Sequence, residues 1–239
     1  MQAPRTEDWI GKLGKLPLIA QPGECWMYNV SGDVLGVLVA RVAGQSFGDF
    51  LRERIFDPLG MKDTAFFVPA EKRDRLPIQY FADRQTNTLG VYDGVADSEW
   101  GQPPPFESGA GGLVSTVDDY FAFCQMMLNK GRAGSTQILS RATVELMTSD
   151  QLTPEQRIGA EIFFGGYSSW GLGMSVETKR DEIFHVPGKF GWEGGLGTSA
   201  RTDPANGMIG IMFSPLLMDS PEAPKLYNDF WTLAYAAME

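Results

Sequence analysis

The sequence predicts an α+β protein, with a mainly helical region followed by antiparallel strands and a C-terminal helix. Within residues 22–60, apolar side chains recur at helical spacing. From Trp170 to Val176 they alternate with glycine and serine, which is the period of a strand. We therefore predict two regions: residues 1–165, mainly helical with long loops, and residues 166–239, strands plus the last helix.

The first helices are expected within residues 22–60. Ser31 is predicted to cap a helix whose apolar face runs from Leu35 to Val42, and Gly44 to end it. The segment Ser46–Asp49 resembles a capping box that opens a second helix. Pro58 and Gly60 are expected to stop that helix.

Residues 68–110 are rich in Pro, Gly, Asp and Gln, which predicts an irregular segment. A helix is predicted near 116–130, with Thr116 as its cap and an apolar face that includes Cys124. A further helix is expected over 140–148.

Antiparallel strands are predicted within residues 168–214. The alternation from Trp170 to Val176 predicts a first strand, and Ile183 to Val186 a second. Leu196–Thr202 and Met208–Phe213 flank a turn sequence and are expected to pair. The last helix is expected to show one apolar stripe, formed by Leu226, Phe230, Leu233 and Ala237.

Composition excludes several function classes. The chain has 239 residues and a formal net charge of −10, so phosphate backbones repel it and nucleic acid is not an expected partner. No apolar run reaches the length of a transmembrane helix, and no membrane role is expected. The single histidine, His185, argues against a His-rich metal site, and we expect neither metal nor cofactor. Because Met1 to Trp9 is not an apolar signal, a cytoplasmic location is expected.

Ordinary searches for a nucleophile fail in this sequence. The one G-x-S-x-G match, Gly44 to Gly48, lies between two predicted helices and not on the strand-to-helix turn of a nucleophile elbow. No S-x-x-K motif occurs; the segment from Ser175 to Lys179 misses it by one position. A Ser-His-Asp triad would have to use His185, and a lone histidine is more often structural. The cysteines, Cys25 and Cys124, form no C-x-x-C pair.

Four segments, in chain order, resemble the serine β-lactamase and penicillin-binding-protein-like family, specifically class C β-lactamases and family VIII esterases. Pro22–Gly36 resembles the stretch around the second motif, and Phe56–Thr64 resembles the PLGM-x-DT segment. Ser108–Thr116 resembles GGL-x-ST, and Phe190–Thr198 stands where the third motif is found. Each match is weak alone, but their shared order is specific. The resemblance implies an incomplete β-lactamase-like fold and acyl transfer to an activated serine.

By that resemblance, Tyr28 is the catalytic tyrosine of the second motif, and Gly195 is the catalytic residue whose N–H faces the oxyanion. Trp192, Glu193 and Gly194 are the expected substrate-binding residues. Val30 replaces the motif asparagine, which favours esters over β-lactams, and Trp192 replaces a lysine or histidine with a flat apolar wall. The alternatives are a core tyrosine and a packing tryptophan.

The family's Ser-x-x-Lys motif does not occur here, so we expect the C-terminal portion of a family member, inactive alone. The expected substrate is a small ester or β-lactam-like molecule. The expected assembly is a homodimer or a complex with a missing N-terminal segment, since an incomplete sheet leaves an unpaired edge. Two other functions stay open. One is a non-catalytic ligand-binding module, and the other is an independent esterase whose nucleophile would be Ser31, Ser108, Ser115 or Ser199.

Overall fold

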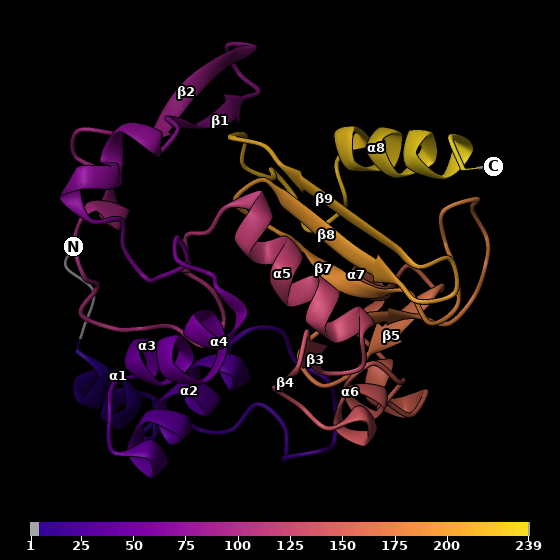
Figure 1. The fold of residues 1–239 in the computed structure, drawn as a ribbon, viewed down its shortest axis with the longest axis horizontal. Helices are drawn as coiled ribbons and strands as arrows, with labels where there is room; N and C mark the ends of the chain where they lie inside the picture. The colour runs from indigo at the N-terminus through magenta and orange to yellow at the C-terminus, as the bar shows by residue number, and fades with distance from the viewer. Residues whose placement is uncertain (1–4, 239) are drawn as a thin grey trace.

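The α+β class is confirmed by the computed structural model, which describes residues 5–238. Helices α1 to α4 gather at one end of the molecule, a five-stranded antiparallel sheet forms the other end, and α5 crosses the sheet (Figure 1). The predicted regions 1–165 and 166–239 include terminal residues that lie outside the described part of the chain. Their boundary stays a prediction.

The helices and strands have the following bounds. The α-helices are α1 Thr6–Leu13, α2 Val30–Ala43, α3 Phe47–Leu51, α4 Asp57–Leu59, α5 Val117–Leu128, α6 Arg141–Met147, α7 Glu161–Phe164 and α8 Lys225–Ala236. A π-helical turn, η1 Arg52–Phe56, joins α3 to α4, and short 3₁₀ turns are η2 Ala70–Arg75, η3 Glu99–Gly101 and η4 Glu155–Arg157. The strands are β1 Gln79–Asp83, β2 Thr88–Asp93, β3 Arg132–Ala133, β4 Thr136–Gln137, β5 Ser168–Trp170, β6 Ser175–Glu177, β7 Phe190–Gly194, β8 Thr198–Asp203 and β9 Met208–Phe213. Strands β5 to β9 pair in sequence order.

Helix α2 ends at Gly44 as predicted, because that glycine adopts the left-handed conformation. The predicted cap is wrong, and the predicted apolar face is not the side that the helix buries. The helix begins two residues earlier, at Val30 after the cap Asn29, and its stripe from Leu35 to Val42 lies on the outside, with Val42 81% exposed. The buried side is instead the small one, because Gly32 and Gly36 let the backbone of another segment approach.

The second helical segment begins as predicted, since the Ser46 hydroxyl accepts a hydrogen bond from the Asp49 N–H. Gly60 ends it in the left-handed conformation, as predicted. Pro58 does not stop it, because it lies in the first turn of α4, where its missing N–H is tolerated. The π turn η1 directly precedes that position.

Residues 68–110 are less irregular than predicted. They contain the hairpin β1–β2, which projects from the body of the molecule (Figure 1). Its turn includes Asn87 with a φ of 54°, a conformation that asparagine tolerates. The strands of this hairpin carry aromatic and β-branched residues. They were not predicted because they are short and are flanked by turn-forming residues.

The next two predicted helices are confirmed. Helix α5 begins after Thr116, whose hydroxyl accepts from the Asp119 N–H, and Cys124 is buried on it. Helix α6 is capped in the same way by Ser140. A buried apolar cluster joins these helices to β6 and β7, and it consists of Met126, Met127, Val144, Val176 and Phe190.

Antiparallel strands within 168–214 are confirmed, with differences in detail. The strand predicted from Trp170 to Val176 is two strands, β5 and β6, because the chain turns at Gly173 with a φ of 89°. Ile183–Val186 is not a strand; the neighbouring strand is β7. The pairing of β8 with β9 around the turn from Asp203 to Gly207 is confirmed.

The final helix is confirmed, but its apolar stripe is not the side packed on the sheet. Leu226 is 49% exposed and Leu233 69% exposed, whereas Tyr227 and Trp231 are buried against the sheet. The sheet face beneath α8 carries buried polar and charged residues such as Arg201. Trp231 suits this face because its indole N–H donates to Ser199 Oγ at 2.9 Å, whereas the buried Tyr227 hydroxyl has no hydrogen-bond partner among the described residues.

No single helix among residues 5–238 is long and apolar enough to cross a bilayer. The pair Val30–Ala43 and Phe47–Leu59 has the length and composition together, but it bends by 80°.

Candidate functional site

Tyr28 lies directly before α2, at a strained point of the backbone. Asn29 has a φ of 81° and a ψ of −71°, and the Val30 N–H donates to the Tyr28 carbonyl across it at 3.2 Å. This geometry is a γ-turn of the rare positive-φ type. Such strain persists only where the surrounding structure holds it, and it is common at functional sites.

The structure brings Tyr28 and Trp192 together across 164 residues of sequence. The indole Nε1–H of Trp192 donates to the phenolic oxygen of Tyr28 at 2.9 Å, and the ring centroids lie 5.6 Å apart. Tyr28 remains 43% exposed. The predicted neighbours from the second-motif and third-motif segments thus share one surface, although their catalytic and binding roles stay predictions.

Aromatic rings surround this hydrogen bond. Phe163 stacks on Tyr28 with centroids 4.9 Å apart, and Trp170 meets Trp192 edge-on at 4.8 Å and 84°. Trp26 contacts several of the same rings, including Trp170 at 5.2 Å. We call this set the aromatic cluster: Trp26, Tyr28, Phe163, Phe164, Trp170 and Trp192. Its uncharged rings suit an apolar or aromatic group. Phe163 was not predicted as a site residue, because it lies in no recognised motif.

Glu193 lies on the opposite face of β7 from Trp192, because successive strand residues alternate. Its carboxylate accepts from Arg201 Nε at 2.9 Å, so its side chain is engaged beneath α8 rather than beside Tyr28. The predicted substrate contact of Glu193 gains no support from this orientation. Sequence reasoning did not foresee Arg201 as its partner.

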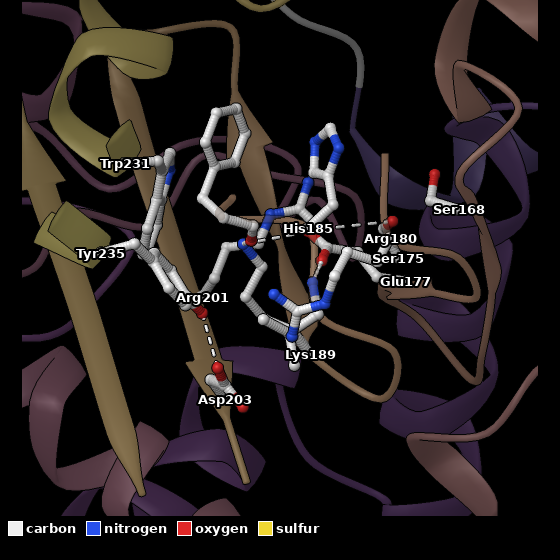
Figure 2. Close-up of polar contacts among 12 residues, drawn as sticks. Ser168, Ser175, Glu177, Arg180, His185, Lys189, Arg201, Asp203, Trp231 and Tyr235 are labelled. Carbon is white, nitrogen blue, oxygen red and sulfur yellow. Dashed lines mark hydrogen bonds and ion pairs between the residues drawn. The ribbon is translucent and has the colours of Figure 1, made fainter. Parts of the chain in front are cut away.

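The sheet face beneath α8 holds a buried charge network, which we define as Glu177, Lys189, Glu193 and Arg201. Glu177, Lys189 and Arg201 are labelled in Figure 2. Lys189, 1% exposed, lies 3.1 Å from the Glu177 carboxylate and 4.8 Å from the centre of the Trp231 ring. Burial raises the pKa of Glu177, and Lys189 and Arg201 oppose that shift. Burial also lowers the pKa of Lys189, opposed by Glu177. The network belongs to the packing of α8.

Gly194 and Gly195 lie where β7 turns into β8. A Cβ atom at Gly194 would lie 2.4 Å from Thr198 Oγ1, whereas one at Gly195 would meet nothing within 4 Å. Gly195 is three residues beyond Trp192, about 10 Å along a strand. The turn therefore presents open backbone on the strand that carries Trp192. The roles predicted for both glycines remain predictions.

Most of the alternative serine nucleophiles are engaged elsewhere. The Ser108 hydroxyl donates to Asp33, Ser115 Oγ lies 2.8 Å from Thr64 Oγ1, and Ser199, buried, accepts from Trp231 Nε1 at 2.9 Å. Ser31 is exposed. Ser108 and Ser199 each lie beside a carboxylate, Asp33 and Glu193 respectively, whereas Ser115 contacts only hydroxyl and backbone groups. All three hydroxyls take part in contacts that hold the fold together.

The single histidine is also built into the packing. His185 Nδ1 pairs with Asp181 at 2.5 Å, and its ring stacks on Tyr167 with centroids 3.7 Å apart. Burial lowers the pKa of His185, and Asp181 opposes that shift. The stacked position of the His185 ring favours a structural role over a role in a catalytic triad. Among the described residues, no group of three or more His, Cys, Asp or Glu side chains is arranged to hold a metal.

The start of α2 is held by the segment from Ser108 to Gly112. Asp33, buried in α2, accepts from the Ser108 hydroxyl and from the Ala110 N–H. A Cβ atom at Gly109 would lie 2.1 Å from the Gly32 carbonyl oxygen, so the two backbones touch. Two of the matched motif segments are thus packed together, and this contact fixes the helix that follows Tyr28.

Comparison with known proteins agrees with the sequence resemblance. The family model described as Beta-lactamase matches residues 2–226. Protein Rv1367c of Mycobacterium tuberculosis is 36% identical over 84% of the chain, which spans 51% of that relative. A protein of Escherichia coli K12 named "Putative D-alanyl-D-alanine carboxypeptidase" is 28% identical over 88% of the chain and is spanned for 48% of its length.

The fold has solved counterparts too. Unliganded simvastatin synthase (LovD) from Aspergillus terreus superimposes with a TM-score of 0.76 at 25% identity, covering 97% of this chain and 62% of that one. Relative to the curated relatives described above, the chain spans about half of their length.

Proposed function

The chain belongs to the beta-lactamase family, and from this we propose that it provides the tyrosine and oxyanion half of a site for acyl transfer from small esters. In this proposal Tyr28 moves a proton at the attacking or leaving oxygen, and the Gly195 N–H donates to the oxyanion. The serine nucleophile is supplied from outside these 239 residues, because no Ser-x-x-Lys occurs among them.

The observation that carries the proposal is the hydrogen bond from Trp192 Nε1 to the oxygen of Tyr28. It joins the two segments that resemble separate catalytic motifs, and acyl transfer needs the groups of both segments around one bound acyl group. Gly195 directly follows the strand that carries Trp192, and a Cβ atom there would meet nothing within 4 Å, which supports its proposed access to substrate.

Esters are the favoured substrate class over β-lactams. The rings that contact Tyr28 are Trp26, Phe163 and Trp192, all uncharged, and Val30 stands where the motif has asparagine. A surface of this kind binds flat apolar groups and offers little to a carboxylate. An uncharged aryl ester is therefore the substrate we propose.

The isolated chain is expected to hydrolyse short aryl esters no faster than buffer. An oxyanion donor and a tyrosine without a nucleophile leave only residual catalysis. Burst kinetics with a p-nitrophenyl ester, together with fluorophosphonate labelling, make the measurement. Adding a segment that carries Ser-x-x-Lys, by co-expression or fusion, is expected to give turnover that Tyr28→Phe abolishes.

The matched control is Tyr92→Phe, which changes another half-exposed tyrosine, on the projecting hairpin. A stoichiometric burst from the chain alone, removed by substituting one serine, would contradict the proposal. It would favour the independent esterase, with Ser31 the first candidate because its side chain is exposed.

We further propose that the chain associates through two exposed features. Strand β9 pairs only with β8 among the described strands, and its sequence from Met208 to Phe213 has no charge or proline. Uncovered apolar edges recruit other strands. The outer stripe of α2 adds exposed side chains, with Leu35 at 58% and Leu38 at 54%.

Light scattering over a range of concentrations is expected to show dimers or larger species. Replacing Ile211 in β9 with lysine is expected to shift the population toward monomer, because charged edge residues oppose pairing. Leu233→Lys on the exposed side of α8 is the control for added charge. A monomer at every concentration, with no binding of a hydrophobic dye, would contradict the association.

A further inference from the structure

We propose that Trp192 is a positioning residue for Tyr28: its indole N–H holds the phenolic oxygen in place and leaves the tyrosine's own O–H for the reaction. The inference rests on the proposed acyl-transfer function, in which Tyr28 handles the proton. It assigns Trp192 a task beyond forming an apolar wall.

Hydrogen-bond capacity gives the first step. An indole N–H only donates, so in the 2.9 Å contact the Tyr28 oxygen must accept. A tyrosine hydroxyl has one donor and two acceptor sites. With one acceptor site occupied by Trp192, the hydroxyl proton must point elsewhere, and 43% of Tyr28 remains open to solvent and ligand.

Both partners are fixed by their neighbours. Trp192 is gripped edge-on by Trp170 at 4.8 Å, and its backbone is paired with Ala200 in the sheet. Tyr28 is stacked on Phe163 at 4.9 Å and is held at the strained Asn29 turn. Because neither ring can follow the other freely, the hydrogen bond sets the direction of the tyrosine hydroxyl.

The nature of the donor has a chemical consequence. A donor on the phenolic oxygen stabilises negative charge that develops there when Tyr28 gives up its proton. Indole does not titrate in the physiological range, so this donor is present whatever the pH, unlike a histidine. Trp192 therefore supplies a constant, uncharged hydrogen bond at this position.

Nuclear magnetic resonance of the full chain tests the positioning without any turnover. The ¹³Cζ signal of Tyr28, identified by its loss in Tyr28→Phe, reports hydrogen bonding at the phenolic oxygen. We expect it to shift and broaden in Trp192→Phe, which keeps a ring but removes the N–H, and to move back toward its original position in Trp192→His. Trp9→Phe is the control, because it makes the same exchange at a tryptophan that packs on Phe106, outside the aromatic cluster. An unchanged Tyr28 signal in Trp192→Phe overturns the inference.

Turnover in the chain supplied with a Ser-x-x-Lys segment gives the second readout. Trp192→Phe is expected to lower kcat roughly tenfold to a hundredfold with KM little changed, and Trp192→His to recover part of the loss. Unchanged or higher kcat in Trp192→Phe overturns the inference. If no ester is turned over at all, the proposed function fails, while the resonance experiment still decides whether Trp192 positions Tyr28.

Discussion

Replacing Lys189 with methionine is expected to lower the free energy of unfolding by about 3–5 kcal/mol. The ammonium lies 3.1 Å from the Glu177 carboxylate, and both side chains are buried, at 1% and 3% exposed. Arg201 Nη1, at 3.9 Å from Glu177, is farther away, and the Nε and Nη2 atoms of the same guanidinium bind Glu193. Methionine has a similar length, so the loss comes from an uncompensated buried charge more than from a cavity. Urea unfolding followed by circular dichroism is the measurement.

Two further variants separate charge from packing. In Glu177→Gln with Lys189→Met, the amide oxygen can still accept from the Val186 N–H, so the double variant is expected to be more stable than Lys189→Met alone. Lys225→Met, on the exposed side of α8 with its side chain 85% open, is expected to change stability by less than about 0.5 kcal/mol. A double variant as unstable as the sum of both single variants would show that the pair is not coupled.

Gly109→Ala is expected to cost about 2–3 kcal/mol and to displace the start of α2. The added Cβ would lie 2.1 Å from the Gly32 carbonyl oxygen and 3.1 Å from the Gly36 nitrogen, and neither backbone atom can move aside alone. Because Tyr28 precedes α2, we expect its hydrogen bond with Trp192 to weaken as well. Chemical unfolding measures the first effect, and exchange of the Trp192 indole proton with solvent measures the second.

Gly111→Ala is the matched control in the same segment. A Cβ atom there would meet nothing within 4 Å, and the residue has no positive φ. Stability is therefore expected to stay equal or to rise slightly, since alanine restricts the unfolded chain. Equal losses in Gly109→Ala and Gly111→Ala would show that the segment does not pack on α2 as described.

Local signals predicted the ends of helices well. Ser46, Thr116 and Gly44 each act within one turn of chain, through a hydroxyl that accepts an N–H or a glycine that turns left-handed. The turn before Met208 is equally local. Hydrogen bonds and backbone conformations of this kind depend on a few neighbouring residues, so the sequence is sufficient to predict them.

Helix faces could not be predicted in the same way. Leu38 and Leu233 were predicted on the apolar stripes of their helices, but those helices bury other sides because of the surfaces that they face. Helix α2 meets the backbone at Gly109, which requires glycine, and α8 meets charged residues, which suit Trp231. Periodicity finds an apolar stripe, but only the facing surface decides whether that stripe is covered.

The candidate site, too, could be predicted only in part from the sequence. Sequence motifs predicted that Tyr28 and Trp192 belong to one surface, and the structure places them in contact. The direction of Glu193 was not foreseen, because a motif treats consecutive residues as a group and a strand sends them to opposite faces. Phe163 enters the site from a short helix that carries no motif.

The alternation of apolar and charged side chains along β7 also disfavours a shifted pairing register. A slip of one residue in its pairing with β8 would carry the Glu193 carboxylate in among the rings of the aromatic cluster and leave Arg201 without its anion. It would equally turn the Trp192 indole toward α8. Each misaligned hairpin would thus combine a stranded charge with a lost ring contact. The two chemically different faces of this short strand therefore favour a single pairing register for β7 and β8.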